Sequence, residues 1–240
     1  YGAFEVKGGD ATPIFDLTPF LRLQRWTDAV VRAEAGDLRA VAAMTSTEMR
    51  GLKKELAEQK RLGEAPAALA RLGRPLEALA DALLSNRLEV LPGLARAAVS
   101  VIDAAQKETE NHDAFKPLAP LLMRLRDDLV PLAAEDQAEL PATRAAQVAA
   151  ARWCFERGLH TQAVVLAREL TVIAYRDREN LDVRAGEARF GGVVGAIMAK
   201  HTDAQRYRDA VLDLPDPLVG ITVDVQQARN AFMHAHVGHA

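Results

Sequence analysis

The sequence is poor in the residues that define disulfide-bonded, β-rich or membrane-spanning proteins. Its 240 residues include one cysteine, Cys154, so no disulfide can form within the chain, as is typical of a reducing compartment. Aromatic residues make up only 5%, whereas Ala and Leu dominate, and this composition favours close-packed helices over sheets. No apolar run approaches membrane-spanning length, and no signal peptide is visible. We therefore predict an all-α, cytoplasmic protein that does not interact with membranes.

The sequence also lacks an overall positive charge and the motifs of common cofactor enzymes. The net charge is −3, so any nucleic acid must be held by a local patch rather than by the whole surface. No Walker loop, Gly-x-Gly-x-x-Gly element, His-Glu-x-x-His or Cys-x-x-Cys pair occurs. Acidic residues are scattered, which gives no basis for a two-metal carboxylate site. We predict no cofactor and no metal.

Hydrophobic residues, 49% of the chain, recur at helical spacing from residue 18 onward. Thr18 is expected to cap the first helix, with Pro19 at its first position, and Gly36-Asp37 to separate it from a second helix that ends near Lys60. The polar, glycine-bearing stretch 177–192 is predicted to be an exposed loop. Further helices are predicted over 65–72, 75–88, 91–110, 115–133, 143–157, 160–175, 193–200 and 204–212, and from about 222 onward.

The first sixteen residues differ from the rest of the chain. The run Tyr1 to Val6 favours β structure and is followed by Lys-Gly-Gly-Asp, so we expect it to be the last strand of an upstream domain. The chain begins with Tyr rather than Met, which we interpret as a sign that it is part of a longer protein. We divide it into residues 1–16, the end of an upstream domain or a linker, and residues 17–240, a helical domain.

Two side chains in the middle of the chain, Cys154 and Glu169, are of types that can take part in chemistry. The sequence around them gives no strong indication of such a role. Cys154 lies between two aromatic residues in a helical pattern, so we predict a buried structural thiol rather than a nucleophile. Glu169 lies in an otherwise apolar helix. Its carboxylate is either on the solvent-facing side of that helix or buried in an ion pair.

The strongest indication of chemistry is the segment 229–234, Arg-Asn-Ala-Phe-Met-His. Arginine is a permanent cation that forks onto phosphate, and histidine moves protons near neutral pH. On a helix Asn230 and His234 share a face, but Arg229 and His234 diverge by about 140°. Either the helix ends or bends near His234, or a second copy of the chain supplies the missing partner across a two-fold axis.

His236 lies nearly on the face of Arg229 and is a reserve candidate. The core-facing stripe is predicted to contain Val225, Ala228, Phe232 and Ala235, with Arg229 and Asn230 near the edge of the buried face.

This segment fits metal-free cleavage of RNA, which carries its own nucleophile, the 2′-hydroxyl. His234 would accept the hydroxyl proton or protonate the leaving 5′-oxygen, and Arg229 would stabilise the extra negative charge on the phosphate. Asn230 would orient His234 or donate to the phosphate. The products would be a 2′,3′-cyclic phosphate and a 5′-hydroxyl, and DNA would be inert. The alternative is that Arg229 caps or salt-bridges a helix end and that the histidines are surface residues.

Three histidines near the C-terminus raise the question of a metal site. His234, His236 and His239 are potential zinc ligands. However, they have no Cys, Asp or Glu near them, and such short patterns often occur by chance. We therefore predict no metal ligands among them.

The same residues carry a resemblance to a known family. Arg229-Asn230-x-x-x-His234 resembles the Arg-x4–6-His signature of HEPN ribonucleases, including the polar residue preferred after the arginine. The stretch from Gln162 to Glu169 resembles an interior helix of that family. The junction between the two domains of CRISPR-associated CARF–HEPN proteins is similar to four short segments here: Tyr1 to Glu5, Asp16 to Phe20, Trp26-Thr27 and Gly36-Asp37.

The resemblance implies an architecture, an activity and a mode of regulation. In this family a Rossmann-like CARF domain binds a cyclic oligoadenylate made during type III CRISPR interference, and it activates a helical HEPN domain that cuts single-stranded RNA as a homodimer. Arg229 and His234 would be catalytic and Asn230 supportive, and residues 1–16 would be the end of the CARF domain. Because that domain is essentially absent here, we do not expect this chain alone to sense the activator. A non-catalytic helical interaction module and a toxin-like HEPN ribonuclease outside CRISPR are the alternatives.

Overall fold

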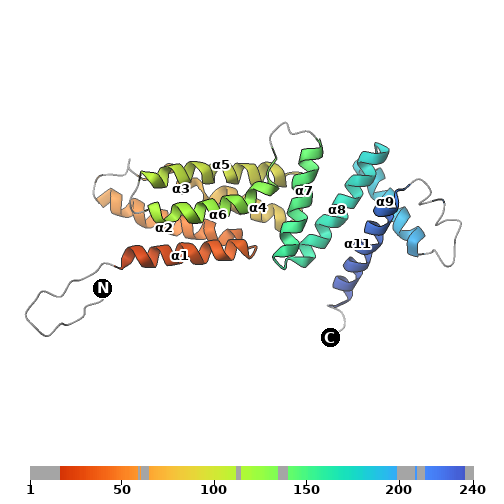
Figure 1. Ribbon diagram of the computed structural model, residues 1–240, viewed down its shortest axis with the longest axis horizontal. Coiled ribbons are helices and arrows are strands. Elements are labelled where there is room, and N and C mark those ends of the chain that lie inside the picture. The colour runs from red at the N-terminus through yellow and green to blue at the C-terminus, as the bar shows by residue number, and fades with distance from the viewer. Residues whose placement is uncertain are drawn as a thin grey trace, which may run out of the picture. The chain divides into compact units, whose positions relative to one another are not determined.

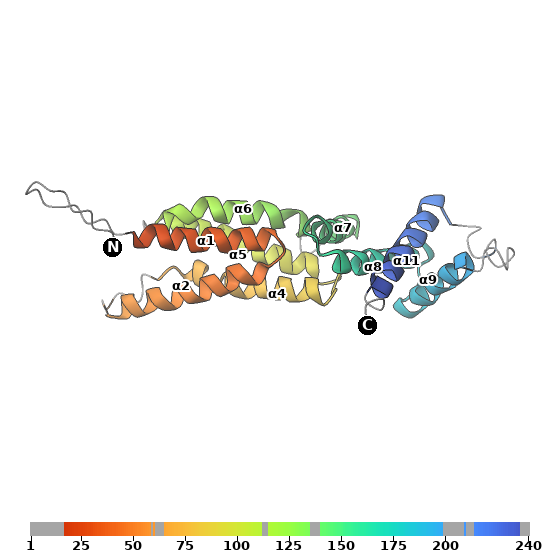
Figure 2. The same ribbon diagram turned by 90° about the horizontal axis from the view of Figure 1, so that it is seen from below.

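The part of the chain described by the computed structural model is built from helices (Figures 1 and 2). The structure describes residues 17–58, 60, 65–111, 115–134, 140–198, 209 and 214–235. These residues contain no strand, which confirms the predicted all-α fold. The strand expected within residues 1–16 lies outside the described residues, as does nearly all of the helix expected over 204–212. None of the described helices combines the length and the apolar character needed to span a bilayer.

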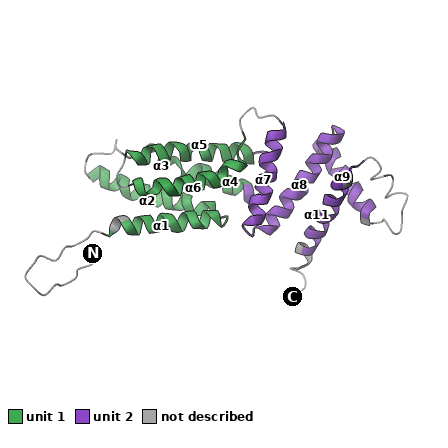
Figure 3. Ribbon diagram, in the orientation of Figure 1, with its two compact units in different colours: residues 1–82, 91–137 green, residues 83–90, 138–240 purple. Residues whose placement is uncertain are grey.

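Contacts among the helices group the chain into two compact units (Figure 3). Unit 1 comprises residues 1–82 and 91–137, and unit 2 comprises residues 83–90 and 138–240. The sequence pattern predicts one helical domain over 17–240 and contains no signal for this division. Arg229 and the rest of the predicted site belong to unit 2.

Unit 1 buries large apolar side chains, Trp26, Leu69 and Ile102 among them. Within the helical stretch predicted over 115–133, three prolines begin a 3-10 turn, an α-helix and a second 3-10 turn, because each proline lies in the first turn of one of them. The elements of unit 1 are α1 (Thr18–Glu34), α2 (Leu38–Glu58), α3 (Ala67–Arg71), most of α4 (Gly73–Leu84), α5 (Leu91–Glu110), η2 (Lys116–Leu118), α6 (Ala119–Leu129) and η3 (Val130–Leu132).

Unit 2 is organised around α8, which packs against α7, α9 and α11. Its core contains Val172, Tyr175 and Phe190. The short segment 83–90 is tied to this unit by the buried Gln147 of α7, whose Nε2 donates to the Leu88 carbonyl at 3.1 Å. The four helices of unit 2 are α7 (Leu140–Glu156), α8 (His160–Glu179), α9 (Val183–Met198) and α11 (Asp216–Ala235).

The predicted exposed loop over 177–192 is wrong, because two helices occupy most of that stretch. α8 continues to Glu179 and ends at Asn180, whose left-handed φ of 51° stops the helix. α9 begins at Val183, and the carboxylate of Asp182 caps it by accepting a hydrogen bond from the Ala185 amide at 2.7 Å. Asn180, which ends α8, and Asp182, which caps α9, are two residues apart, and this polar junction resembles a loop in sequence. The final helix also begins earlier than predicted, at Asp216 instead of near residue 222.

The glycines of α9 have two different environments, and one of them allows α8 and α9 to pack closely. At Gly186 an added Cβ would lie 2.2 Å from Cγ and 2.9 Å from Cδ of Arg176 on α8. At Gly191, which is exposed on the same helix, an added Cβ would meet nothing within 4 Å. Gly186 is therefore required by packing, whereas Gly191 has no packing role in this structure.

We expect Gly186→Ala and Gly191→Ala to change stability in opposite directions. The first should lower the free energy of unfolding by about 1–3 kcal/mol, because the new methyl group collides with Arg176. The second should raise it by about 0.5–1 kcal/mol, because alanine favours the helix. Urea unfolding followed by circular dichroism measures both. Equal effects of the two substitutions would contradict the close approach of α8 and α9.

Candidate functional site

The helix α11, which carries the Arg229–His234 segment, is fixed against α8 by a buried pair of hydroxyl groups. Thr222 is fully buried, and its Oγ1 lies 2.9 Å from the Tyr175 hydroxyl. The Thr222 hydroxyl donates to the Leu218 carbonyl at 2.8 Å, so Tyr175 is the donor within the pair. Burial raises the pKa of Tyr175, which keeps its phenol protonated. The pair therefore sets the position of α11 along α8.

Arg229 continues the buried stripe of α11 but is itself exposed. It follows Thr222 by seven residues and Val225 by four, which places it within about 20° and 40° of them around an ideal helix. Thr222 is 0% exposed and Val225 8% exposed, whereas Arg229 is open to solvent. Among the described residues, Arg229 has neither a hydrogen-bond nor an ion-pair partner. A permanent cation thus follows the buried stripe at a position that is open to solvent.

A hollow between α8 and α11 borders this exposed position. Tyr175 lies opposite Thr222, whereas Ala163 and Ala167 line a hollow together with Val225 and Ala228, so α8 and α11 run in opposite directions (Figure 1). Ala228, the residue before Arg229, lines this hollow, so α8 does not pack closely against α11 there.

Asn230 points toward α9 and is held by a neighbour in its own helix. It is partly buried, and its Oδ1 accepts a hydrogen bond from Nε2 of Gln226 at 3.1 Å. Together with Val194 and Ile197 of α9 it lines a small pocket of about 50 Å³. The bond to Gln226 fixes the amide so that its Nδ2 remains available as a donor.

The structure places the other predicted C-terminal residues only in part. His234 lies in the last turn of α11, and its side chain lies outside the described residues, as do His236 and His239. In the predicted core-facing stripe Val225 is buried, while Ala228 is only partly buried. The side chains of Phe232 and Ala235 lie outside the described residues as well.

A shallow groove, which the sequence pattern did not predict, runs along α8 between α7 and α11. It has a volume of about 350 Å³ and is almost entirely apolar. We call it the α7–α11 groove. The alanine pattern indicated buried positions and gave no sign that some of them would stay open. Its apolar lining comes from Phe155 of α7, from Ala163, Val164 and Ala167 of α8, and from Val225 and Ala228 of α11.

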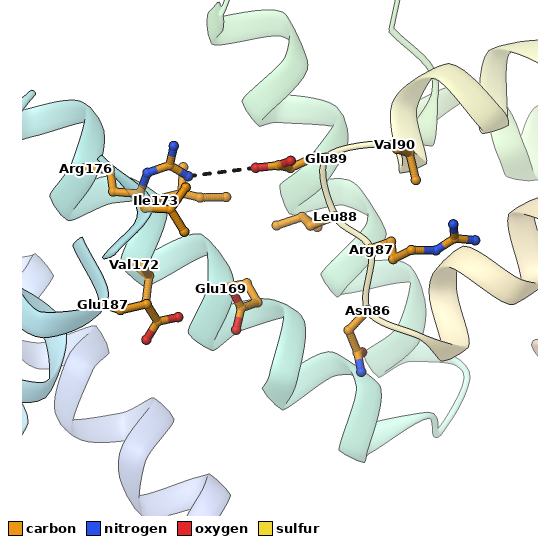
Figure 4. A pocket seen from close by; sticks show the side chains of 11 residues that line it. Asn86, Arg87, Leu88, Glu89, Val90, Glu169, Val172, Ile173, Arg176 and Glu187 are labelled. Atoms are coloured by element: carbon orange, nitrogen blue, oxygen red, sulfur yellow. Dashed lines mark ion pairs between the residues drawn. The ribbon is translucent and has the colours of Figure 1, made fainter. Parts of the chain in front are cut away.

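A second hollow in unit 2, of about 290 Å³, contains Glu169 (Figure 4). Arg168 donates through Nη1 to Glu169 at 2.6 Å and through Nη2 to Glu187 of α9 at 2.7 Å. Arg176 lies 3.8 Å from the carboxylate of Glu89. Glu169 therefore combines the two predicted possibilities, since its side chain is partly exposed and also ion-paired. Because guanidinium groups engage these carboxylates, we assign no catalytic role to this hollow.

Cys154 and the acidic residues add no further chemistry. Cys154 is fully buried, and burial raises the pKa of its thiol to about 11, so it is neutral at physiological pH. This confirms the predicted buried thiol. Within the described ranges, no three His, Cys, Asp or Glu side chains are grouped so that they could hold a metal ion.

In comparisons with protein-family models, with curated proteins and with solved structures, nothing matches this chain. The resemblance to CARF–HEPN proteins therefore rests on the short segments identified in the sequence, and it stays a prediction.

We expect Tyr175→Phe to lower the free energy of unfolding by about 1 kcal/mol, because it removes one buried hydrogen bond between α8 and α11. Thr222→Val removes the same bond from the other side. The double variant should therefore lose less than the sum of the two single losses. Urea unfolding of the four proteins measures this coupling. Strict additivity would show that the two hydroxyl groups do not depend on each other.

Proposed function

We propose that this chain is the helical ribonuclease part of a CARF–HEPN-type protein. It is a metal-independent endoribonuclease that cleaves single-stranded RNA through attack of the 2′-hydroxyl, and it acts as a homodimer. In the parent protein the activity is switched on by cyclic oligoadenylate during type III CRISPR antiviral defence. Arg229 and His234 are the catalytic residues, and Asn230 supports them.

The observation that carries this proposal is the uncovered position of Arg229. The side chains one and two turns earlier on the same stripe are buried, whereas Arg229 is exposed. An arginine without a partner among the described residues instead offers its planar fork of donors to a phosphate. The resemblance of segment 229–234 to the HEPN signature supports the same conclusion.

The backbone of α11 supports a site that two copies complete together. α11 remains helical through His234, and five helical residues separate the directions of Arg229 and His234 by about 140°. One straight helix therefore does not direct both side chains at one phosphate. Two copies related by a two-fold axis can bring an arginine and a histidine together from different chains.

The chemistry divides among three side chains. His234 takes the proton of the 2′-hydroxyl or gives one to the leaving 5′-oxygen, and Arg229 stabilises the charge that develops on the phosphate. The Oδ1 of Asn230 is engaged by Gln226, so its Nδ2 donates to the phosphate or to His234. Donors aimed at developing charge contribute most in a site from which water is excluded.

We expect Arg229→Ala to reduce cleavage of an unstructured RNA by about 100-fold or more, because the charge on the phosphate loses its stabilising cation. His234→Ala should abolish cleavage, because no group then transfers the proton. Gel analysis of end-labelled RNA measures both, with Arg184→Ala as the matched control, since Arg184 is an exposed arginine on α9. Circular dichroism verifies that each variant is folded. Full activity in either site variant would refute the assignment.

The proposed chemistry predicts how cleavage responds to chelator and substrate. EDTA should leave the rate unchanged, because the nucleophile belongs to the RNA and no metal is needed. A substrate with one 2′-deoxy nucleotide at the cut position should resist cleavage there. The products of normal RNA should end in a 2′,3′-cyclic phosphate, as mass spectrometry can establish. Loss of activity in EDTA would instead indicate a metal-dependent site.

A non-catalytic interaction module is the main alternative, and the exposed apolar side chains along the α7–α11 groove are the observation that favours it. It predicts no RNA cleavage by the intact chain at any protein concentration. A toxin-like ribonuclease outside CRISPR would share the chemistry of Arg229 and His234. It would differ in having no response to cyclic oligoadenylate in the full-length protein.

A further inference from the structure

We propose that the α7–α11 groove is the surface through which two copies of this chain associate. In this contact Phe155 of each copy enters the groove of the other, and Arg152 of each copy faces Asp224 of the other. The inference rests on the proposed function in that it assumes a homodimer. It goes further by assigning the surface and the residues that hold the two copies together.

The groove is hollow because small side chains line its floor. Ala163, Val164 and Ala167 of α8 lie between the flanking helices α7 and α11, and none of them is large enough to fill the space between those helices. The result is an apolar hollow of about 350 Å³ that is open to solvent. An apolar hollow of this size can accept a large side chain, and most of its lining cannot form hydrogen bonds with water.

The same face presents a large side chain that matches this hollow. Phe155 lines the groove at its α7 side, and 63% of the residue is exposed. Val148, 47% exposed, precedes Phe155 by seven residues on α7, and Ile221, 51% exposed, precedes Ala228 by seven residues on α11. A spacing of seven places each pair within about 20° on its helix. Exposed apolar side chains gathered on one face are typical of an interaction surface.

Charge identifies a second copy as the occupant. Arg152 lies on the α7 wall of the groove and Asp224 on the α11 wall, and both are exposed. Neither has an ion-pair partner among the described residues. A two-fold contact is self-complementary, so that when one residue meets another across it, the same pair also meets with the chains exchanged. An exposed ring, which packs edge-on against His160, together with a hollow and two opposite charges on one face, is compatible with this condition.

The groove also borders the position where a second copy is needed. Ala228 immediately precedes Arg229, and Val225 lies within about 40° of Arg229 around the helix. A partner seated in the groove therefore brings its own chain next to the uncovered part of α11. The surface that holds the dimer and the site that the dimer completes would be neighbours on one helix.

Charge exchange tests the contact directly. Arg152→Glu and Asp224→Arg should each raise the dissociation constant of the dimer by about tenfold or more, because each places like charges opposite one another. The double variant recreates both pairs with their signs exchanged, so its dissociation constant should return to within a few-fold of the original.

Phe155→Ser should weaken the dimer further than either single charge reversal. Arg184→Glu, the same charge reversal on α9, should have no effect. Analytical ultracentrifugation without RNA measures all five variants.

Three outcomes would overturn the inference: an intact chain that stays monomeric at high concentration, a double variant that does not recover, or Phe155→Ser that dimerises normally. Circular dichroism shows whether each variant is folded, and folding is expected because the three residues are exposed. The readout is independent of the proposed activity. If Arg229→Ala cleaved RNA as well as the original chain, the ribonuclease proposal would fail while dimerisation through the groove could still be confirmed. Loss of the dimer only in Arg229→Ala would count against the groove.

Discussion

The central position of α8 in unit 2 determines where every candidate functional residue lies. Its three neighbours meet it through different kinds of side chain. α11 is positioned by the buried hydroxyl pair of Tyr175 and Thr222. α9 approaches closely at Gly186. Toward the groove, α8 presents only small side chains. Bulkier side chains in place of Ala163 or Ala167 would fill the groove.

Apolar burial, rather than the ion pairs, provides most of the energy that holds these helices together. The core around Tyr175, Phe190 and Val193 is almost completely removed from water, and burial contributes about 25 cal/mol for each Å² of apolar surface. Exposed ion pairs contribute about 0–1 kcal/mol each. The half-buried Arg168 has a more specific role, since its guanidinium group binds two carboxylates and lies 5.1 Å from the centre of the Phe190 ring. Hydrogen bonding to Glu187 raises the pKa of Arg168, so the group stays charged and fixes the register of α9 on α8.

Much of the helical structure could be predicted from the sequence, and the failures have clear physical causes. Periodicity identified the all-α fold, and the apolar surroundings of Cys154 identified a buried thiol. The prediction of a loop over 177–192 was wrong because Asn180 ends one helix and Asp182 caps the next within three residues. Such a junction has the same polar composition as a loop. The predicted start of α11 was too late, because Pro217 lies in the first turn of the helix, where proline is tolerated.

The residues of the candidate site come from the sequence and stay a prediction, whereas their surroundings come from the structure. The type and spacing of Arg229, Asn230 and His234 favour chemistry, and helix geometry predicts either a bend near His234 or a second chain. The groove could not be predicted, because alanines that line an open hollow repeat along a helix in the same way as alanines in a core.

The stripe position of Arg229 has a consequence for how this protein can change over evolutionary time. A leucine at this position would continue the apolar stripe of α11 and would cost the fold nothing, since the charge has no partner among the described residues. Selection for stability alone therefore has no reason to retain arginine here. If the arginine persists while the rest of the stripe varies among apolar residues, the pressure that retains it acts on what the side chain binds.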